Sequence, residues 1–240
     1  MEYLKQVARC VKNRDFKSPA ALDLLTNDAD RADSGASGTQ SGIEIVDRAD
    51  NSVPMDSDGA ADGLAEALEL VGKSALGDDT VNTLMLKMFA ANVNTVVVDT
   101  SVAGNVMNGF MPVESMQKIC TGVTKEQILI PVICGKNHWC SIMMDLMTKD
   151  VCIYDPMNSS YGVNLRPIAD KLAMMVPNAA PRRYRVRAYH SDLGVQVDSY
   201  NCGVYMLLAF ELFAGAENIS QLSRKELQYL RYRYLCMCLN

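Results

Sequence analysis

The sequence has few histidines and a single tryptophan, and it lacks the features of secreted or membrane proteins. Its 240 residues include two histidines and one tryptophan. No apolar run reaches the roughly 18 residues that a membrane span requires, and charges interrupt the stretch from Met1 to Phe16, where a signal peptide would be apolar. The eight cysteines lack the regular spacing of disulfide-rich secreted domains. These absences predict an intracellular chain without membrane association, whose thiols stay reduced.

Positive charge is also scarce, which argues against nucleic acid as a general partner. The chain carries 23 lysines and arginines against 28 acidic residues, a net charge of -5. Affinity for nucleic acids depends on many contacts between basic side chains and phosphates. One basic cluster remains, formed by Arg182, Arg183, Arg185 and Arg187. It suits an acidic protein surface, a nucleic-acid backbone or a solvated edge strand.

Composition divides the chain into three segments. Residues 1–25 begin with apolar side chains at helical spacing, which predicts a short N-terminal helical segment. Residues 26–63 are rich in Asp, Ser, Gly and Ala and contain no aromatic residue. They bury too little apolar surface to offset the entropy of ordering, so we predict a disordered acidic, Ser- and Gly-containing linker. The remaining residues, 64–240, are dense in apolar side chains and are expected to form one compact domain.

Within this domain the apolar pattern predicts helices, then strands, then helices again. Helical spacing marks the segments 64–72, 80–92, 163–175, 202–213 and 223–238. Extended apolar or alternating runs mark the segments 95–98, 128–134, 139–146, 151–154 and 184–189. The polar residues 147–150 supply a tight turn, so the two strands on either side of it form a hairpin. This order favours an α+β fold with a central mixed or antiparallel sheet flanked by helices.

The hairpin carries two residues that suit acid–base chemistry. His138 opens its first strand, followed by Trp139, and Asp155 ends its second strand. Pro156 stops the ladder there, because proline has no N–H to donate. An antiparallel hairpin brings His138 and Asp155 to the same end of the sheet, where a carboxylate can fix the imidazole tautomer.

A candidate nucleophile lies at the start of the most apolar helix. Cys202 follows the polar residues Asp198, Ser199 and Asn201, so its thiol is expected in the first turn. There the helix dipole and a nearby protonated histidine favour the thiolate. Gly203 beside it is expected to leave room for a substrate backbone. Cys202 is therefore predicted to be the nucleophile at the N-terminus of a buried helix.

Other cysteines and the second histidine offer weaker sites. Cys140 lies two residues from His138 on the same strand face, but a position inside a strand favours a structural thiol. Cys236 and Cys238 have no second Cys or His pair at zinc-binding spacing, and His190 stands alone. We expect no metal and no cofactor.

These motifs occur in an order that resembles a known family. They are His138-Trp139, Tyr154-Asp155, Gln196 and Asn201-Cys202-Gly203-Val204-Tyr205, with 202 − 196 = 6 residues from the glutamine to the cysteine. The pattern closely resembles the Ulp1-like cysteine proteases, which process ubiquitin-like modifiers. The resemblance runs from about Leu76 to the end of the chain and implies a papain-like protease fold over residues 64–240.

The resemblance also implies roles for four residues. Cys202 would attack the carbonyl carbon, His138 would transfer the proton and Asp155 would orient the imidazole. Gln196 would donate a hydrogen bond to the oxyanion together with the Cys202 backbone N–H. Trp139, Gly203 and Asp79 would contact the substrate.

Two positions depart from the family pattern. Family members usually carry Trp-Leu-Asn-Asp near the start of the domain, where this chain has Leu-Gly-Asp-Asp at residues 76–79. Leu76 therefore replaces one of the two tryptophans that enclose the Gly-Gly tail of the modifier, and Trp139 matches the other. Asn201 replaces the aspartate that usually precedes the nucleophile, and we expect it to keep a polar helix cap.

The sequence thus predicts a monomeric cysteine peptidase that cleaves after the C-terminal glycine of a ubiquitin-like modifier, of the SUMO or NEDD8 class, through an acyl-thioester. Its partners would be the modifier or its conjugates, and the family implies a nuclear or cytoplasmic location. Two alternatives stay open. One is an acetyltransferase with a related Cys/His site, and the other is a decayed, mobile-element-derived protease that only binds modifiers.

Overall fold

A mixed β-sheet forms the centre of the described structure. The computed structural model describes residues 69–106, 109–135, 137–176, 184–217, 219 and 221–239, so the predicted segments 1–25 and 26–63 lie outside the described residues. The strands are β1 (Thr95–Val97), β2 (Asn105–Val106), β3 (Gln127–Cys134), β4 (His138–Asp145), β5 (Asp150–Tyr154) and β6 (Arg185–Ala188). They are ordered β1-β3-β4-β5-β6, and β2 pairs with the far end of β3.

The three middle strands are antiparallel, and the flanking strands are parallel to their neighbours. β3 pairs with β4 and β4 with β5 in antiparallel register, while β1 and β2 run parallel to β3 and β6 runs parallel to β5. Parallel pairing requires a crossover, and α7 (Tyr161–Met175) supplies it between β5 and β6. The predicted hairpin of β4 and β5 is confirmed, with Ser141 opposite Tyr154.

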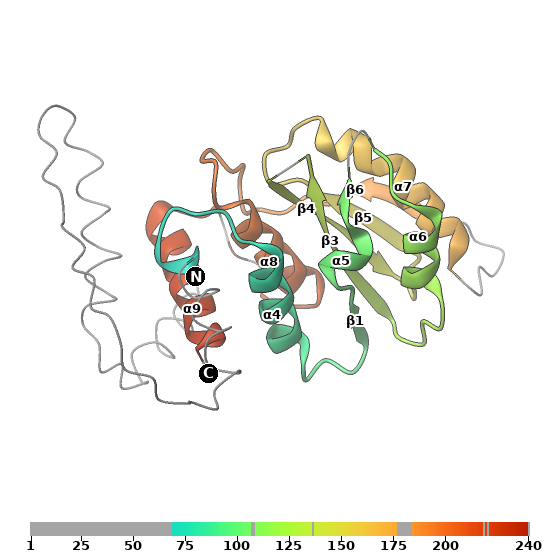
Figure 1. The fold of residues 1–240 in the computed structure, drawn as a ribbon, viewed down its shortest axis with the longest axis horizontal. Helices are drawn as coiled ribbons and strands as arrows, with labels where there is room; N and C mark the ends of the chain where they lie inside the picture. The colour runs from blue at the N-terminus through green and yellow to red at the C-terminus, as the bar shows by residue number, and fades with distance from the viewer. Residues whose placement is uncertain are drawn as a thin grey trace, which may run out of the picture.

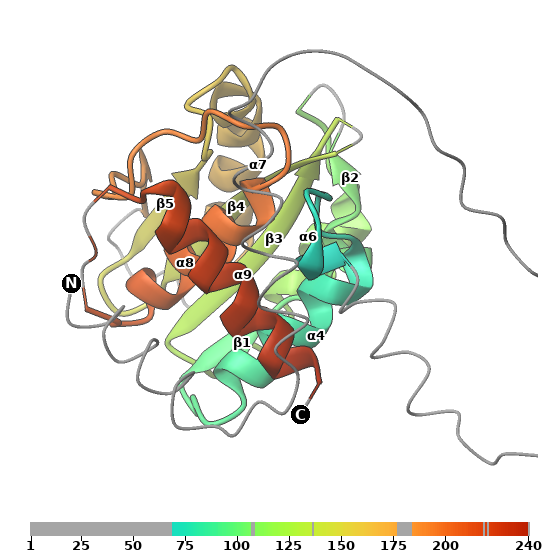
Figure 2. The same ribbon diagram turned by 90° about the vertical axis from the view of Figure 1, so that its left-hand side faces the viewer.

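Helices cover both faces of this sheet, as Figures 1 and 2 show. One face is covered by α4 (Asp78–Phe89), α8 (Cys202–Phe213) and α9 (Arg224–Cys238). The other is covered by α5 (Thr100–Ala103), α6 (Val113–Cys120) and α7. None of the helices in the described ranges is long and apolar enough to cross a bilayer.

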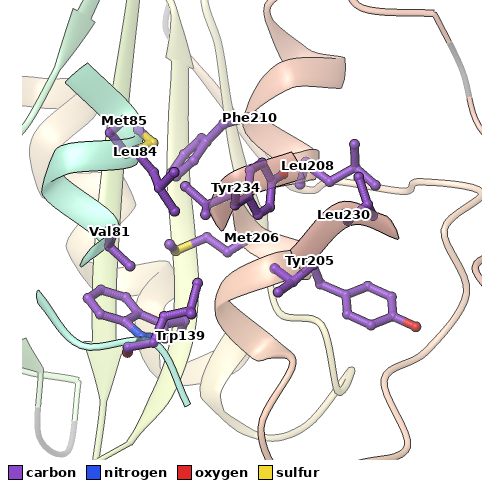
Figure 3. Packing of buried hydrophobic residues seen from close by; sticks show 14 of the residues in the cluster. Val81, Leu84, Met85, Trp139, Tyr205, Met206, Leu208, Phe210, Leu230 and Tyr234 are labelled. Atoms are coloured by element: carbon purple, nitrogen blue, oxygen red, sulfur yellow. Dashed lines mark hydrogen bonds between the residues drawn. The ribbon is translucent and has the colours of Figure 1, made fainter. Parts of the chain in front are cut away.

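Two apolar clusters hold these layers together. β3 and β4 are apolar along nearly their whole length because both of their faces are covered. Successive side chains point to opposite faces, so Trp139 and Met143 join α8 while Cys140 and Ile142 face α7. Figure 3 shows the first cluster, in which side chains of α4, α8 and α9 meet those of the sheet. Ten of the twelve residues of α8 are buried, which explains why it is apolar all round.

A buried arginine ties the last helix to the start of the described chain. Arg231 of α9 is only 3% exposed. Its guanidinium donates to the carbonyl oxygens of Glu69, Leu70 and Ser74 and to the side-chain oxygen of Asn201. Because a buried charge is tolerated only when it is hydrogen-bonded, this network fixes three chain segments relative to one another.

The sequence predicted most of these elements to within two or three residues. The helix at 202–213 has the predicted bounds, and a capping box of Ser223 and Glu226 opens α9 within one residue of the predicted start. The helix expected at 80–92 begins earlier and ends at Phe89. Of the helix expected at 64–72, residues 69–71 are helical and 64–68 are outside the described residues. The apolar pattern did not indicate α5, α6 and β2, because elements of two to eight residues are too short to show a clear period.

Replacing Arg231 with methionine is expected to destabilise the fold strongly. Methionine leaves the buried carbonyl oxygen of Leu70 and the buried side-chain oxygen of Asn201 without the donors of Arg231, and each unpaired buried group costs about 1–3 kcal/mol. Chemical denaturation should show a loss of about 3 kcal/mol in the free energy of unfolding.

The control for this variant is Arg185→Met. The Arg185 side chain is 73% exposed where it pairs with Asp150, and exposed ion pairs contribute about 0–1 kcal/mol. Equal losses in the two variants would contradict the role given to Arg231.

Candidate active site

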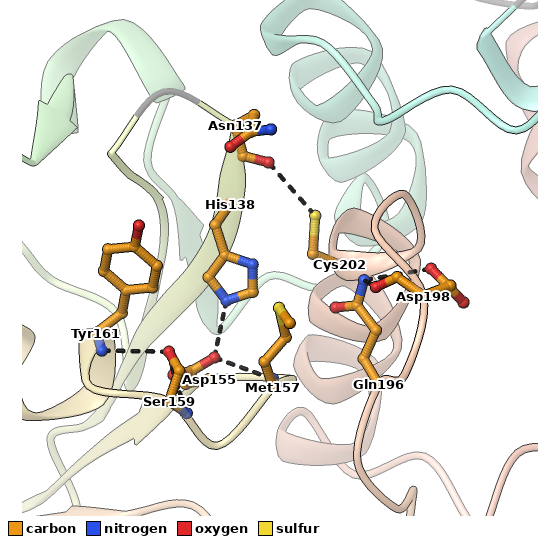
Figure 4. A network of polar contacts seen from close by, with 9 residues as sticks. All are labelled: Asn137, His138, Asp155, Met157, Ser159, Tyr161, Gln196, Asp198 and Cys202. Atoms are coloured by element: carbon orange, nitrogen blue, oxygen red, sulfur yellow. Dashed lines mark hydrogen bonds and ion pairs between the residues drawn. The ribbon is translucent and has the colours of Figure 1, made fainter.

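The end of the β4–β5 hairpin joins the predicted histidine and aspartate. His138 is the first residue of β4, and Asp155 directly follows β5. The Nε2–H of His138 donates to Oδ1 of Asp155 over 2.8 Å. The contact predicted from the hairpin pattern is therefore present, and Figure 4 shows the other ring nitrogen on the side of Cys202.

Asp155 is held as a carboxylate by its own turn. Its Oδ1 also accepts from the backbone N–H of Met157, and its Oδ2 accepts from both the backbone N–H and the hydroxyl of Ser159. Burial by itself would raise the pKa of Asp155, but the hydrogen bonds from His138, Ser159 and Met157 outweigh it and lower this pKa to about 2. Asp155 is therefore ionised throughout the physiological range.

The charge of Asp155 in turn sets the protonation of His138. Burial opposes the imidazolium, but the hydrogen bonds with Asp155 and Cys202 prevail and raise the pKa of His138 to about 9. The ring of Tyr161 stacks on the imidazole, with centroids 5.3 Å apart and planes at 25°. His138 is thus oriented by a hydrogen bond on one edge and by a ring on one face, and it carries a proton at neutral pH.

Cys202 lies where the sequence predicted, at the start of α8. It is the first residue of the helix, so its sulfur is close to the positive end of the helix dipole. The thiol donates to the backbone oxygen of Asn137 over 3.7 Å, and Cys202 is only 1% exposed. Together with His138 and Asp155, it forms an arrangement that can supply a nucleophile and an oriented acid–base group.

Gln196 is anchored beside these residues, with its amide donor turned away from them. Its backbone N–H donates to the oxygen of Pro156 over 2.8 Å, which joins its loop to the turn of Asp155. Its side-chain Nε2 donates to the backbone oxygen of Asp198 over 2.8 Å. Among the described residues the buried Oε1 has no hydrogen-bond partner, and in Figure 4 this oxygen lies on the side of His138.

The structure corrects the expectation for Gly203. We expected its missing side chain to leave space for a substrate backbone. That space is filled, because a Cβ atom on Gly203 would lie 3.0 Å from Cδ1 of Leu76 and 3.1 Å from its Cβ and Cγ. An alanine at this position would press on Leu76, which would have to move by a few tenths of an ångström.

Trp139 is also buried rather than open to a substrate. It is 2% exposed, and its indole N–H donates to the backbone oxygen of Leu76 over 2.6 Å. Its ring packs in the core cluster near Val81 and Met206 (Figure 3). The sequence could not reveal this, because the cover comes from a residue 63 positions away.

The other predicted contacts have mixed outcomes. Asp79 is exposed in the first turn of α4, and no hydrogen bond or ion pair joins it to His138 or Cys202 among the described residues. Asn201 does not cap α8 with its side chain, contrary to expectation. Its amide nitrogen instead donates to Asp198 and its oxygen accepts from Arg231.

Sequence reasoning also missed residues that shape the site. Ser159 and Tyr161 lie in the turn after Asp155, and their roles depend on how that turn folds. Asp198 accepts backbone N–H groups from Tyr200 and Asn201. Asp side chains often accept hydrogen bonds from backbone N–H groups that follow them closely in a turn. This preference could have identified Asp198.

The residues also include one group with metal-ligand chemistry. Donor atoms of His138, Cys140 and Asp155 lie within 4.8 Å of one another. However, Cys140 is completely buried, and its hydrogen bond with Cys134 and its burial hold the pKa of its thiol well above the ordinary value. A protonated thiol is a poor metal ligand, which agrees with the structural role predicted for Cys140.

Family comparison decides the class of this site. The model of the Ulp1 protease family, C-terminal catalytic domain, matches residues 107–239, just over half of the 240 residues. The chain belongs to the Ulp1 protease family. It is therefore a cysteine protease, as the motifs predicted. No curated protein sequence matches this Ulp1-family chain.

Solved structures share the fold of this Ulp1-family domain. The Ulp1 protease domain in complex with Smt3, the yeast ortholog of SUMO, is 17% identical with a TM-score of 0.56, covering 73% of this chain and 81% of the other. Ulp1 with its catalytic cysteine oxidised to a sulfenic acid is 16% identical, with a TM-score of 0.56 and coverages of 72% and 81%. The Chlamydia trachomatis effector Cdu1 bound to ubiquitin is 10% identical, with a TM-score of 0.50 and coverages of 67% and 91%. The predicted α+β protease fold is confirmed.

Removing the charge of Asp155 is expected to lower the pKa of His138. In Asp155→Asn the side chain keeps its shape but no longer stabilises the imidazolium. The NMR titration of the His138 ring should therefore move from about 9 in the wild type toward the ordinary value of about 6.5. A His190→Gln variant assigns the resonances, because the chain has two histidines. An unchanged midpoint would contradict this assignment.

The same pKa predicts how stability changes with pH. The folded state binds the His138 proton more tightly than the unfolded state, so this group stabilises the fold fully below pH about 6.5. That contribution is lost as the pH rises toward the folded-state pKa of about 9. Between these values, the free energy of unfolding should fall more steeply in the wild type than in Asp155→Asn.

Proposed function

We propose that the chain hydrolyses a peptide or isopeptide bond after the C-terminal glycine of a ubiquitin-like modifier. The observation that carries this proposal is the position of His138 between a carboxylate and a thiol at a helix N-terminus. Cys202 is the nucleophile, His138 the acid–base catalyst and Asp155 its orienting partner.

The proposed reaction has two steps. Cys202 Sγ attacks the carbonyl carbon as a thiolate, forming a C–S bond and a tetrahedral oxyanion. The oxyanion collapses, the C–N bond breaks and His138 gives its proton to the leaving amine, which leaves an acyl-thioester. Water then gives a proton to His138 as it attacks the thioester, and collapse releases the glycine carboxylate and restores Cys202. Asp155 stays ionised and stabilises each imidazolium.

Gln196 is proposed to stabilise the oxyanion after its amide turns. In the structure Nε2 donates to Asp198, while the unpartnered Oε1 lies on the side of the site. A half-turn of the amide would present an N–H to the oxyanion, next to the backbone N–H of Cys202. The turn would give up the hydrogen bond from Nε2 to the backbone oxygen of Asp198 in exchange for one to the oxyanion.

Two observations support a ubiquitin-like substrate. The solved Ulp1 domain binds Smt3, and Cdu1 is bound to ubiquitin, on the same fold. Around Cys202, the close cover of Leu76 over Gly203 favours a tail without side chains. We propose that such a modifier or its conjugate is the partner, and SUMO or NEDD8 is the proposed class.

The acetyltransferase alternative uses the same three residues but would need a site for acetyl-CoA. Nothing in the sequence singles out a cofactor-binding motif, so hydrolysis remains the proposal. Labelled acetyl-CoA distinguishes the two, because a transferase would retain the label on Cys202.

A panel of modifier probes tests the proposed function. Vinyl-sulfone probes built on SUMO, NEDD8 and ubiquitin should form a covalent adduct at Cys202 with at least one modifier, detected by intact mass. Cys202→Ala should form none, and Cys152→Ala, which removes a buried thiol of β5, should react like the wild type. No adduct with any probe, in a chain that folds normally, would support the alternative of a decayed, binding-only module.

Gln196→Ala is expected to slow hydrolysis without preventing modifier binding. Loss of one oxyanion donor lowers kcat by about 10²- to 10³-fold, because the donor acts only in the transition state. Steady-state kinetics on a fluorogenic modifier substrate should show this loss in kcat with little change in KM. Gln117→Ala, at an exposed position of α6, is the control. A wild-type kcat in Gln196→Ala would remove Gln196 from the mechanism.

A further inference from the structure

The nucleophile of this chain is covered in the structure. Cys202 is 1% exposed and Trp139 is 2% exposed. A residue enclosed to this extent offers little of its side chain to the carbonyl carbon of a polypeptide unless a neighbouring group moves.

Leu76 is the group that lies against the residue after the nucleophile. Its side chain occupies the space above Gly203, where even one added carbon would contact it at 3.0 Å. Its backbone oxygen accepts the indole N–H of Trp139 over 2.6 Å. Leu76 is itself only 3% exposed, so it is wedged between the nucleophile helix and the tryptophan next to His138.

The segment that carries Leu76, residues 72–77, is fastened at its C-terminal end and in its middle, and we call it the strap. At its C-terminal end the carboxylate of Glu69 accepts from the backbone N–H of Gly77 over 2.7 Å and from the hydroxyl of Thr80 over 2.6 Å. In its middle, Arg231 donates to the backbone oxygen of Ser74 over 2.9 Å. The strap backbone is therefore held at Ser74 and Gly77, so uncovering Gly203 requires the Leu76 side chain itself to move.

We propose that Leu76 is a gate residue, whose side chain must be displaced before a substrate tail can pass Gly203 and reach Cys202. This inference rests on the proposed function, since it identifies the residue that controls entry to the same site. The strap holds Leu76 in place beside the nucleophile. The size of the side chain at position 76 then determines the fraction of molecules in which the Cys202 thiol is accessible.

Alkylation by iodoacetamide measures this gate without needing a modifier. The Cys202 sulfur displaces iodide and forms a thioether, and the rate is proportional to the population of the open form. Leu76→Ala should raise the second-order rate constant at Cys202 about tenfold, which corresponds to about 1.4 kcal/mol. Mass spectrometry of the Cys202 peptide follows the reaction, and the peptide carrying Cys152 provides an internal reference.

Leu84→Ala is the matched control. Leu84 is a fully buried leucine of α4 in the same core cluster as Leu76, so its removal destabilises the fold without opening the space above Gly203. If Leu76 is the gate, Cys202 in Leu84→Ala should be alkylated at the wild-type rate. Equal acceleration in both variants would show that general loosening exposes the thiol, and an unchanged rate in Leu76→Ala would remove the gate.

Two further variants keep the test decisive if Leu76→Ala does not fold. Leu76→Val shortens the side chain and should accelerate alkylation in the same direction by a smaller factor. Gly203→Ala should lower the melting temperature, and combining it with Leu76→Val should cost less than the sum of the single changes, because the two sites share one contact. Simple additivity would contradict the packing of Leu76 on Gly203.

This test separates the gate from the proposed function. A chain that reacts with no modifier probe can still show faster alkylation in Leu76→Ala, which would support the gate and reject the substrate class. Conversely, a modifier adduct combined with an unchanged alkylation rate would support the substrate class and reject the gate.

Discussion

The hydrogen bond between His138 and Asp155 is the interaction on which the site depends. Both groups are largely enclosed, so each would be costly as an isolated charge. Asp155 tolerates burial because the turn after β5 supplies donors from Met157 and Ser159, and its charge then keeps the imidazole protonated. The turn after β5 therefore stabilises the Asp155 carboxylate, and the carboxylate stabilises the His138 imidazolium, which lies next to the Cys202 thiol. The hairpin register is essential to this order, because a shift by one residue would turn His138 to the other face of the sheet.

The parts of this arrangement that the sequence predicted are those encoded locally. Asp155-Pro156 ends a strand, Met147 to Asp150 form a turn, and the apolar run after Cys202 indicates a buried helix. Each of these signals lies within a few residues of the feature that it predicts. Two strands joined by a short turn must be antiparallel, so even the contact between residues 138 and 155 followed from local information. The family resemblance added Gln196, whose placement beside Asp155 depends on a loop.

The parts that could not be predicted are contacts between distant segments. Arg231 reaches Leu70 across 161 positions, and Trp139 reaches Leu76 across 63. Both partners are backbone oxygens, which every residue has, so no side-chain pattern marks them. The same limit explains the corrections. Asn201 has the composition of a helix cap, but its side chain is taken by Asp198 and Arg231. A glycine such as Gly203 indicates that some other group comes close to the backbone. Only the fold shows that this group is Leu76 of the same protein.

Leu76 contacts both Gly203 and Trp139, so it links the corrections made for these two residues. The resemblance placed it where the family has a tryptophan, and the structure shows its side chain packed against Gly203 and its backbone oxygen bound to the Trp139 indole. A leucine side chain is smaller than an indole, and it offers no flat face to a substrate backbone. Under the proposed gate, residue 76 therefore gives a bound tail less contact and is displaced more easily than a tryptophan. Glu69 and Arg231 fasten the strap backbone. Having leucine instead of tryptophan at position 76 therefore changes mainly the side chain there and leaves the backbone geometry around Cys202 intact.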